Sequence, residues 1–182
     1  RLLTARRLMT PADRRAADQD LYGNLRNLLA ERRPRTVAAY VPMASEPFGS
    51  AEEKILPEVL AADDLRPQVL LPVWRGSGEL AWASYTGPQD LVSGTWGILE
   101  SRGDATHSLA DADLILVPAL AVNPAGYRLG RGAGCYDRAL RHTRGLTVAV
   151  VYEAELGLEL PICEHDVPVD ATMAPSGTRR MQ

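Results

Sequence analysis

Two apolar runs on either side of a glycine-rich turn constrain the fold of this chain more than any other feature. The first run is ADLILVPAL, residues 112–120, and the second is LTVAVVY, residues 146–152. Continuous apolar runs of this length are typical of strands that are buried on both faces of a parallel sheet. The segment between them, YRLGRGAGCYDRAL at residues 127–140, predicts a loop followed by a short helix that begins at about Cys135. Strand, loop, helix and strand in this order predict a crossover unit whose loop lies at the carboxyl end of a buried strand.

The remaining sequence alternates between helical and strand patterns. Thr10 is a good N-cap and Pro11 suits the first helical position, so a long helix is predicted over residues 10–33. Its apolar stripe consists of four leucines, Leu21, Leu25, Leu28 and Leu29. A second helix, interrupted by Pro57, is predicted over residues 50–64. Further strands are predicted at residues 36–42, 68–73 and 80–86, whereas residues 93–110 have the least structured composition.

Length and composition limit the class of protein. The chain has 182 residues, 46% of them hydrophobic, and shows no repeat or linker, so we expect one α/β domain over residues 1–182. A formal net charge of -3 gives no general attraction to nucleic acid or to an anionic membrane, and we expect neither as a partner.

Cysteine usage and the absence of long apolar segments bear on the compartment. The two cysteines, Cys135 and Cys163, are too few for a disulfide scaffold and fit a reducing compartment. The sequence has no apolar run of about 18 residues, and RLLTARRLMT does not have the pattern of a signal peptide. We therefore expect a cytoplasmic protein, and a monomer.

The glycine-rich turn has the residue types of a phosphate-binding loop. Gly130, Gly132 and Gly134 allow positive φ and close approach of a ligand to the backbone, and Arg128 and Arg131 are charged donors. A helix that begins just after the turn would add the positive end of its dipole. The spacing is neither that of a P-loop nor that of the dinucleotide fingerprint. From these residues alone, phosphate binding and a plain strand-to-helix connection remain equal alternatives.

Asp137 would lie in the first turn of that helix, beside any bound phosphate. Like charges repel, so a carboxylate at this position predicts a bridging Mg²⁺ if polyphosphate binds.

A longer segment around the turn resembles a known family. DLILVPALAVNPAGYRLGRGAGCYDRAL, residues 113–140, is similar to the signature of the 5-formyltetrahydrofolate cyclo-ligases, also called methenyltetrahydrofolate synthetases. Supporting segments occur in the family's order along the chain: ARRLMTPADRR, AAYVPMASEP, LLPV, TWGILE and EHDVPVD. The resemblance implies an open, mostly parallel sheet flanked by helices, in a three-layer architecture like that of ribose-phosphate isomerase and CoA-transferase domains.

The resemblance also implies a reaction. In this family ATP phosphorylates the formyl oxygen of 5-formyltetrahydrofolate, and N10 of the folate then closes the ring to 5,10-methenyltetrahydrofolate with release of ADP and phosphate. Arg131 carries over as the residue that stabilises developing charge, and Asp137 and Asp166 carry over as ligands of Mg²⁺. The folate-contacting positions fall near Met43 and Glu46, together with Arg131 and Cys135. The ATP phosphate loop comprises Arg128, Leu129, Gly130, Arg131, Gly132, Ala133, Gly134, Cys135 and Tyr136.

Three features depart from the family pattern. Cys135 replaces the first of two tyrosines, Ala133 replaces a glycine or lysine, and the basic pair that contacts ATP would precede Arg1. A protein of the same fold that binds nucleotide or folate without turnover is therefore an alternative. A sugar-phosphate isomerase or CoA-transferase is a more distant one, because the sequence offers no separate acid and base for that chemistry.

Overall fold

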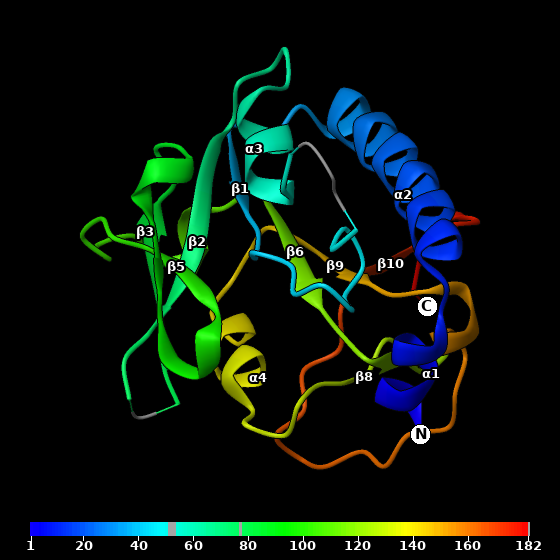
Figure 1. Cartoon of the computed structure of the whole chain (residues 1–182). Coiled ribbons are helices and arrows are strands. Elements are labelled where there is room, and N and C mark those ends of the chain that lie inside the picture. The colour runs from blue at the N-terminus through cyan, green and yellow to red at the C-terminus, as the bar shows by residue number, and fades with distance from the viewer. Residues whose placement is uncertain (51–53, 77, 182) are drawn as a thin grey trace.

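The sheet of this protein is open and mostly parallel, as the sequence predicted (Figure 1). The structure is a computed structural model that describes residues 1–50, 54–76 and 78–181. Within these residues, seven strands form one sheet in the order β11-β10-β9-β6-β1-β2-β3. The five strands from β10 to β2 pair in parallel, and each edge carries one antiparallel strand, β11 or β3. The bounds of the sheet strands are, in chain order, Thr36–Ala38 (β1), Gln68–Trp74 (β2), Leu80–Ser84 (β3), Leu114–Pro118 (β6), Leu146–Val150 (β9), Ala171–Ala174 (β10) and Gly177–Arg180 (β11).

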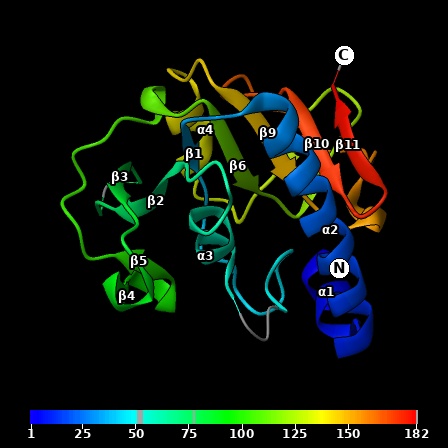
Figure 2. The same ribbon diagram turned by 90° about the horizontal axis from the view of Figure 1, so that it is seen from above.

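Helices cover both faces of the sheet and make three layers. Figure 2 shows α2 and α3 on one side and α4 on the other. Side chains alternate along each strand, so Val37 of β1 lies in the core beneath α2 and its neighbour Ala38 lies in the core that includes Leu140 of α4. The helices are α1 (Leu2–Leu8), α2 (Pro11–Arg32), α3 (Leu56–Ala61) and α4 (Cys135–Leu140).

The long helix α2 begins and ends for local reasons. The Thr10 side chain accepts a hydrogen bond from the backbone N–H of Asp13, and Arg33 ends the helix in the left-handed conformation. The four leucines of the predicted stripe are all buried. This helix is confirmed, whereas the short helix α1 that precedes it had no sequence signal of its own. None of the helices in the described residues is long and apolar enough to cross a membrane.

The predicted crossover unit is confirmed, with one addition. Strand β6 leads into the glycine-rich loop and α4, and β9 then pairs with β6 in parallel. Between β6 and the loop the chain makes a small antiparallel pair, β7 (Ala121–Val122) with β8 (Arg128–Leu129), that the sequence did not predict. This pair joins Arg128 and Leu129, at the start of the loop, to the chain just after β6.

Other predictions differ in detail. The strand predicted at residues 36–42 ends at Ala38, because the chain turns away from the sheet into the loop that contains Met43. The helix predicted over residues 50–64 is confined to α3, and residues 51–53 of that prediction lie outside the described residues. Residues 93–110 are more structured than predicted, since β4 (Leu91–Ser93) pairs with β5 (Leu99–Ser101). Short 3-10 turns complete the list: η1 (Pro88–Asp90), η2 (Thr95–Gly97), η3 (Leu109–Asp111) and η4 (Glu153–Glu155).

Candidate functional site at the carboxyl ends of the central strands

Three loops meet beyond the carboxyl ends of β1, β6 and β9. These strands are neighbours and run in parallel, so the segments that follow them leave the sheet at the same edge. The loop after β1 contains Met43 and Glu46, the segment after β6 leads to the glycine-rich loop, and Tyr152 follows β9. The topology therefore brings together residues that are widely separated in the sequence.

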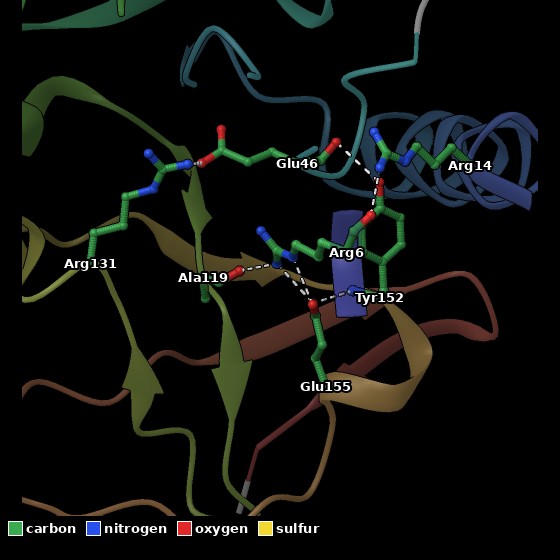
Figure 3. Close-up of polar contacts among 7 residues, drawn as sticks. All are labelled: Arg6, Arg14, Glu46, Ala119, Arg131, Tyr152 and Glu155. Carbon is green, nitrogen blue, oxygen red and sulfur yellow. Dashed lines mark hydrogen bonds and ion pairs between the residues drawn. The ribbon is translucent and has the colours of Figure 1, made fainter. Parts of the chain in front are cut away.

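Two predicted site residues from different loops make an ion pair. Arg131 donates a hydrogen bond to Glu46 over 3.0 Å, although the residues are 85 positions apart (Figure 3). The other carboxylate oxygen of Glu46 accepts the backbone N–H of Met43 at 3.0 Å. The Glu46 side chain is only 12% exposed, whereas the Arg131 side chain is 45% exposed. A fixed carboxylate thus faces an arginine that is open to solvent.

The glycine-rich loop has two of its three glycines in the left-handed region. Gly132 has φ 95° and Gly134 has φ 61°, and α4 begins directly after Gly134, as predicted. The expectation for Gly130 is wrong, because its backbone does not have positive φ. Leu129 to Ala133 are exposed, so the loop offers its backbone and the Arg131 guanidinium to solvent.

Arg128 has a different environment from Arg131. Its side chain is 3% exposed and donates to Asp137 at 2.8 Å and to the Val167 carbonyl at 2.6 Å. Burial lowers the pKa of Arg128, and the nearby Asp137 carboxylate opposes that effect. The buried guanidinium therefore ties the start of the loop to α4 and to the segment around Val167.

The two predicted metal ligands lie in adjoining segments. Asp137 accepts the backbone N–H of Val167 at 3.2 Å, and Val167 directly follows Asp166. Asp166 accepts the backbone N–H of Cys163 at 2.8 Å. In the described residues no group of three or more His, Cys, Asp or Glu side chains could hold a metal ion.

Asp170, which lies close to Asp166 in the sequence, is engaged elsewhere. It accepts hydrogen bonds from the backbone and hydroxyl of Thr147 in β9, at 2.8 and 2.6 Å. Of the two aspartates in EHDVPVD, only Asp166 lies next to the Asp137 contact. Two carboxylates suit Mg²⁺, which usually keeps water or phosphate oxygens in its remaining positions.

Cys135 and Tyr136 begin α4 and face different environments. The Cys135 thiol is partly exposed and lies 3.8 Å from the Ala133 carbonyl oxygen. The ring of Tyr136 packs edge-on against Trp82, with 6.4 Å between ring centroids. Burial raises the pKa of the Tyr136 hydroxyl. Cys135 therefore lies on the solvent-facing side of the loop, whereas Tyr136 packs against Trp82 and supports the loop from within.

The structure adds residues that the sequence interpretation missed. Arg6 of α1 pairs with Glu155, and the hydroxyl of Tyr152 donates to the Glu46 carbonyl at 3.1 Å (Figure 3). Arg14 donates to the Ala44 carbonyl at 2.9 Å. Arg6 and Arg14 both lie in the ARRLMTPADRR segment that resembles the family, but nothing in the sequence indicated these contacts, and Tyr152 and Glu155 had no signal of that kind.

A recess of about 380 Å³ lies away from these loops, between α2 and the β9, β10 and β11 strands. Its polar lining includes Asn24, Glu31, Arg32 and Arg180. None of the predicted site residues contributes to it, so the candidate site remains the loop edge.

Known proteins resemble this chain over nearly its whole length. The model of the 5-formyltetrahydrofolate cyclo-ligase family matches residues 1–175. A 5-formyltetrahydrofolate cyclo-ligase from Mycolicibacterium smegmatis is 39% identical, over 96% of this chain and 90% of that protein. The enzyme of the same name from Escherichia coli is 32% identical, over 60% of this chain and 64% of that protein.

Solved structures agree with the sequence comparisons. The 5,10-methenyltetrahydrofolate synthetase of Aquifex aeolicus superimposes with a TM-score of 0.82 at 31% identity, covering 100% of this chain and 89% of that one. The synthetase of Mycoplasma pneumoniae has a TM-score of 0.74 at 19% identity, covers 94% of this chain and 93% of that one, and supports the fold. The resemblance noted from the sequence is confirmed.

Proposed function

Because the chain belongs to the 5-formyltetrahydrofolate cyclo-ligase family and is a ligase, we propose that it converts 5-formyltetrahydrofolate to 5,10-methenyltetrahydrofolate with ATP and Mg²⁺. The observation that carries the proposal is the contact between Glu46 and Arg131 at 3.0 Å. It joins the predicted folate side of the site to the predicted ATP side. Phosphoryl transfer requires both substrates to meet with their reacting atoms aligned, and this contact supports a meeting point between Glu46 and Arg131.

The proposed chemistry has two steps. The γ-phosphoryl group of ATP passes to the formyl oxygen, and ADP leaves. The folate N10 then attacks the formyl carbon and loses its proton, and the carbon–oxygen bond breaks as phosphate departs. The second nitrogen is supplied by the substrate, so the protein needs no nucleophile of its own. Its tasks are positioning and stabilisation of charge.

The glycine-rich loop is suited to the phosphates. Backbone with positive φ at exposed Gly132 and partly buried Gly134 can present N–H groups to an anion. The exposed Arg131 can turn from Glu46 to the phosphoryl group in transfer and stabilise its charge. Buried Arg128 holds Asp137 in place, so it would contribute to binding by supporting the loop from the protein side.

The metal would be held by Asp137 and Asp166. The donor set fits, because two carboxylate-bearing segments adjoin through the contact between Asp137 and Val167. When bound, Mg²⁺ would neutralise charge on the phosphates of ATP. Asp137 has one oxygen bonded to Arg128 and to Val167, which keeps the carboxylate oriented whether or not a metal is present.

The folate would bind on the Glu46 side. A carboxylate that is 12% exposed and fixed by the Met43 N–H can accept hydrogen bonds from the N–H groups of a pterin ring. Cys135 at the open side of the loop would lie near the same ligand.

Ring closure linked to ATP consumption tests the proposal. With Mg²⁺, ATP and 5-formyltetrahydrofolate, the protein should produce the near-ultraviolet absorbance of the methenyl product and one ADP per product. No ADP should form without folate. A protein that binds without turnover would show a thermal shift with ATP or folate and no absorbance change, and that result would refute the ligase activity.

Arg131→Ala supplies the test of the site. Turnover should fall far more than ATP affinity, because the arginine is proposed to meet charge that develops during transfer. Arg26→Ala, which removes an exposed arginine of α2, is the matched control and should behave as the wild type.

A further inference from the structure

Tyr152 makes a hydrogen bond to the candidate site, and the acceptor is the main chain of Glu46. Its hydroxyl donates to the carbonyl oxygen of Glu46 over 3.1 Å, across 106 positions of sequence. Within the described residues, Tyr152 makes no hydrogen bond to the glycine-rich loop. Its possible contribution is therefore the placement of Glu46.

The tyrosine itself is held from two sides. Its backbone N–H donates to Glu155 at 2.8 Å, and the guanidinium of Arg6 lies over its ring, 5.5 Å from the centroid. Arg6 in turn makes two hydrogen bonds to Glu155, at 2.6 and 2.8 Å, and one to the Ala119 carbonyl (Figure 3). Tyr152, Arg6 and Glu155 are all buried. The phenol oxygen is thus fixed relative to the ends of both β6 and β9.

The loop that Tyr152 contacts needs such restraint. Phe48 has φ 67°, an unfavourable conformation for a bulky residue, and its side chain is fully buried. Its backbone N–H donates to the buried Asp18 carboxylate of α2 at 2.7 Å. The Tyr40 hydroxyl donates to the Pro47 carbonyl at 3.3 Å. Strained backbone persists only where several contacts determine it together, and the Tyr152 bond ties the Glu46 main chain to the segment after β9.

We infer that Tyr152 is a positioning residue: its hydroxyl fixes the main chain of Glu46 so that the carboxylate faces Arg131. This inference rests on the proposed function of Glu46 and Arg131. Arg6 and Glu155 extend the effect to α1, because they fix the ring that carries the hydroxyl. Loss of the hydroxyl should loosen the Glu46 backbone and weaken folate binding without removing any group that touches the substrate.

Tyr152→Phe is the variant that tests this inference. It keeps the buried ring and removes one neutral hydrogen bond. Tyr85→Phe is the matched control, because the Tyr85 hydroxyl is buried and has no hydrogen-bond partner in the described residues. The first readout is amide hydrogen exchange over residues 43–50, where Glu46 and Gly49 donate to Met43 and Glu46 carbonyls at 2.8 Å. Exchange there should accelerate about two- to tenfold in Tyr152→Phe and stay at the wild-type rate in the control.

The second readout is a double-mutant cycle with Glu46→Gln. Tyr152→Phe alone should raise KM for the folate about two- to tenfold with a smaller change in kcat. In the Glu46→Gln background the same change should have little further effect, because the carboxylate that it positions is gone. An equal effect in both backgrounds would overturn the inference, since it would show that Tyr152 acts independently of Glu46.

The two readouts separate this inference from the proposed function. If the wild-type protein makes no methenyl product, the proposed function fails, and hydrogen exchange still decides whether Tyr152 fixes the loop. Unchanged exchange over residues 43–50 in Tyr152→Phe refutes the positioning role whatever the activity is.

Discussion

Glu155→Gln should release the amino-terminal helix α1 from the protein. Arg6 is the only buried residue of this seven-residue helix, and Glu155 is its ionic partner. Burial by itself would lower the pKa of Arg6, but the hydrogen bonds and charge of Glu155, together with the nearby Glu46 and Tyr152, outweigh burial and raise it, so Arg6 stays charged. An isolated helix of this length is unstable in water, and α1 therefore depends on this contact.

The size of the effect follows from what Arg6 can do after the substitution. Leaving a buried charge without its partner costs about 3–5 kcal/mol when the charge must stay buried. Arg6 is the only buried residue of α1, so the helix can undock and carry the guanidinium into water, and the loss is limited to the free energy with which α1 binds to the rest of the protein. After the cost of burying the guanidinium is subtracted, three charge-assisted hydrogen bonds with little apolar burial leave roughly 2 kcal/mol for that quantity. For a chain of 182 residues this lowers Tm by about 4–8 °C.

Trypsin detects the release directly, because it cleaves after arginine. Cleavage after Arg6 and the exposed Arg7 should be about tenfold or more faster in Glu155→Gln than in the wild type, since roughly 1.4 kcal/mol already changes the undocked population tenfold. Glu159→Gln, which neutralises an exposed glutamate four positions later, is the control. Equal cleavage rates and equal Tm values for the two variants would refute the claim that the Arg6–Glu155 pair holds α1 in place.

Three further outcomes are expected at the loop edge. Asp137→Asn should abolish turnover while far-UV circular dichroism stays native, and Tm should fall because buried Arg128 loses its carboxylate partner; full activity would exclude Asp137 from the metal site. Glu46→Gln should tighten ATP binding up to about fivefold in calorimetry without folate, because Arg131 is then free to bind phosphate. Weaker ATP binding would contradict the idea that the Glu46 carboxylate and the phosphate compete for Arg131. Iodoacetamide should label Cys135 more slowly when ATP is present and Cys163 at the same rate with or without it, and equal behaviour of both thiols would place Cys135 outside the site.

The central part of the fold is predictable because its signals are local. The apolar runs that became β6 and β9 are buried on both faces, and the glycines between them break the pattern at the point where α4 begins. The leucine stripe and Thr10 cap likewise identify α2. Pairing at the sheet edges is less visible. Strands β10 and β11 form a hairpin in which only β10 is buried, and β11, with Thr178 to Arg180 exposed, carries no strand pattern in its sequence.

The candidate site is predictable to the extent that its residues lie in one segment. Loop residues 128–137 are contiguous, and the family resemblance placed Glu46 and Asp166 near them. The resemblance gave the two loop arginines different roles, but the sequence could not predict that their burial differs. Arg128 and Arg131 are three positions apart and have the same chemistry, yet Arg128 is buried against Asp137 while Arg131 is open to solvent. Arg128 lies in β8, which pairs with β7, whereas Arg131 follows that pair in the exposed part of the loop.

The support of the site depends on contacts that no local pattern encodes. Arg6 and Arg7 are adjacent in the sequence, and such a basic pair normally indicates solvated charge. The structure separates them completely, because Arg6 is 2% exposed and meets Glu155 across 149 positions while Arg7 faces water. A buried arginine is stable only where a carboxylate and carbonyl oxygens are already placed to receive it. Here those acceptors lie just beyond the ends of β6 and β9, so the burial of Arg6 depends on the assembled edge of the sheet. The same edge positions Tyr152, whose hydroxyl donates to the Glu46 carbonyl.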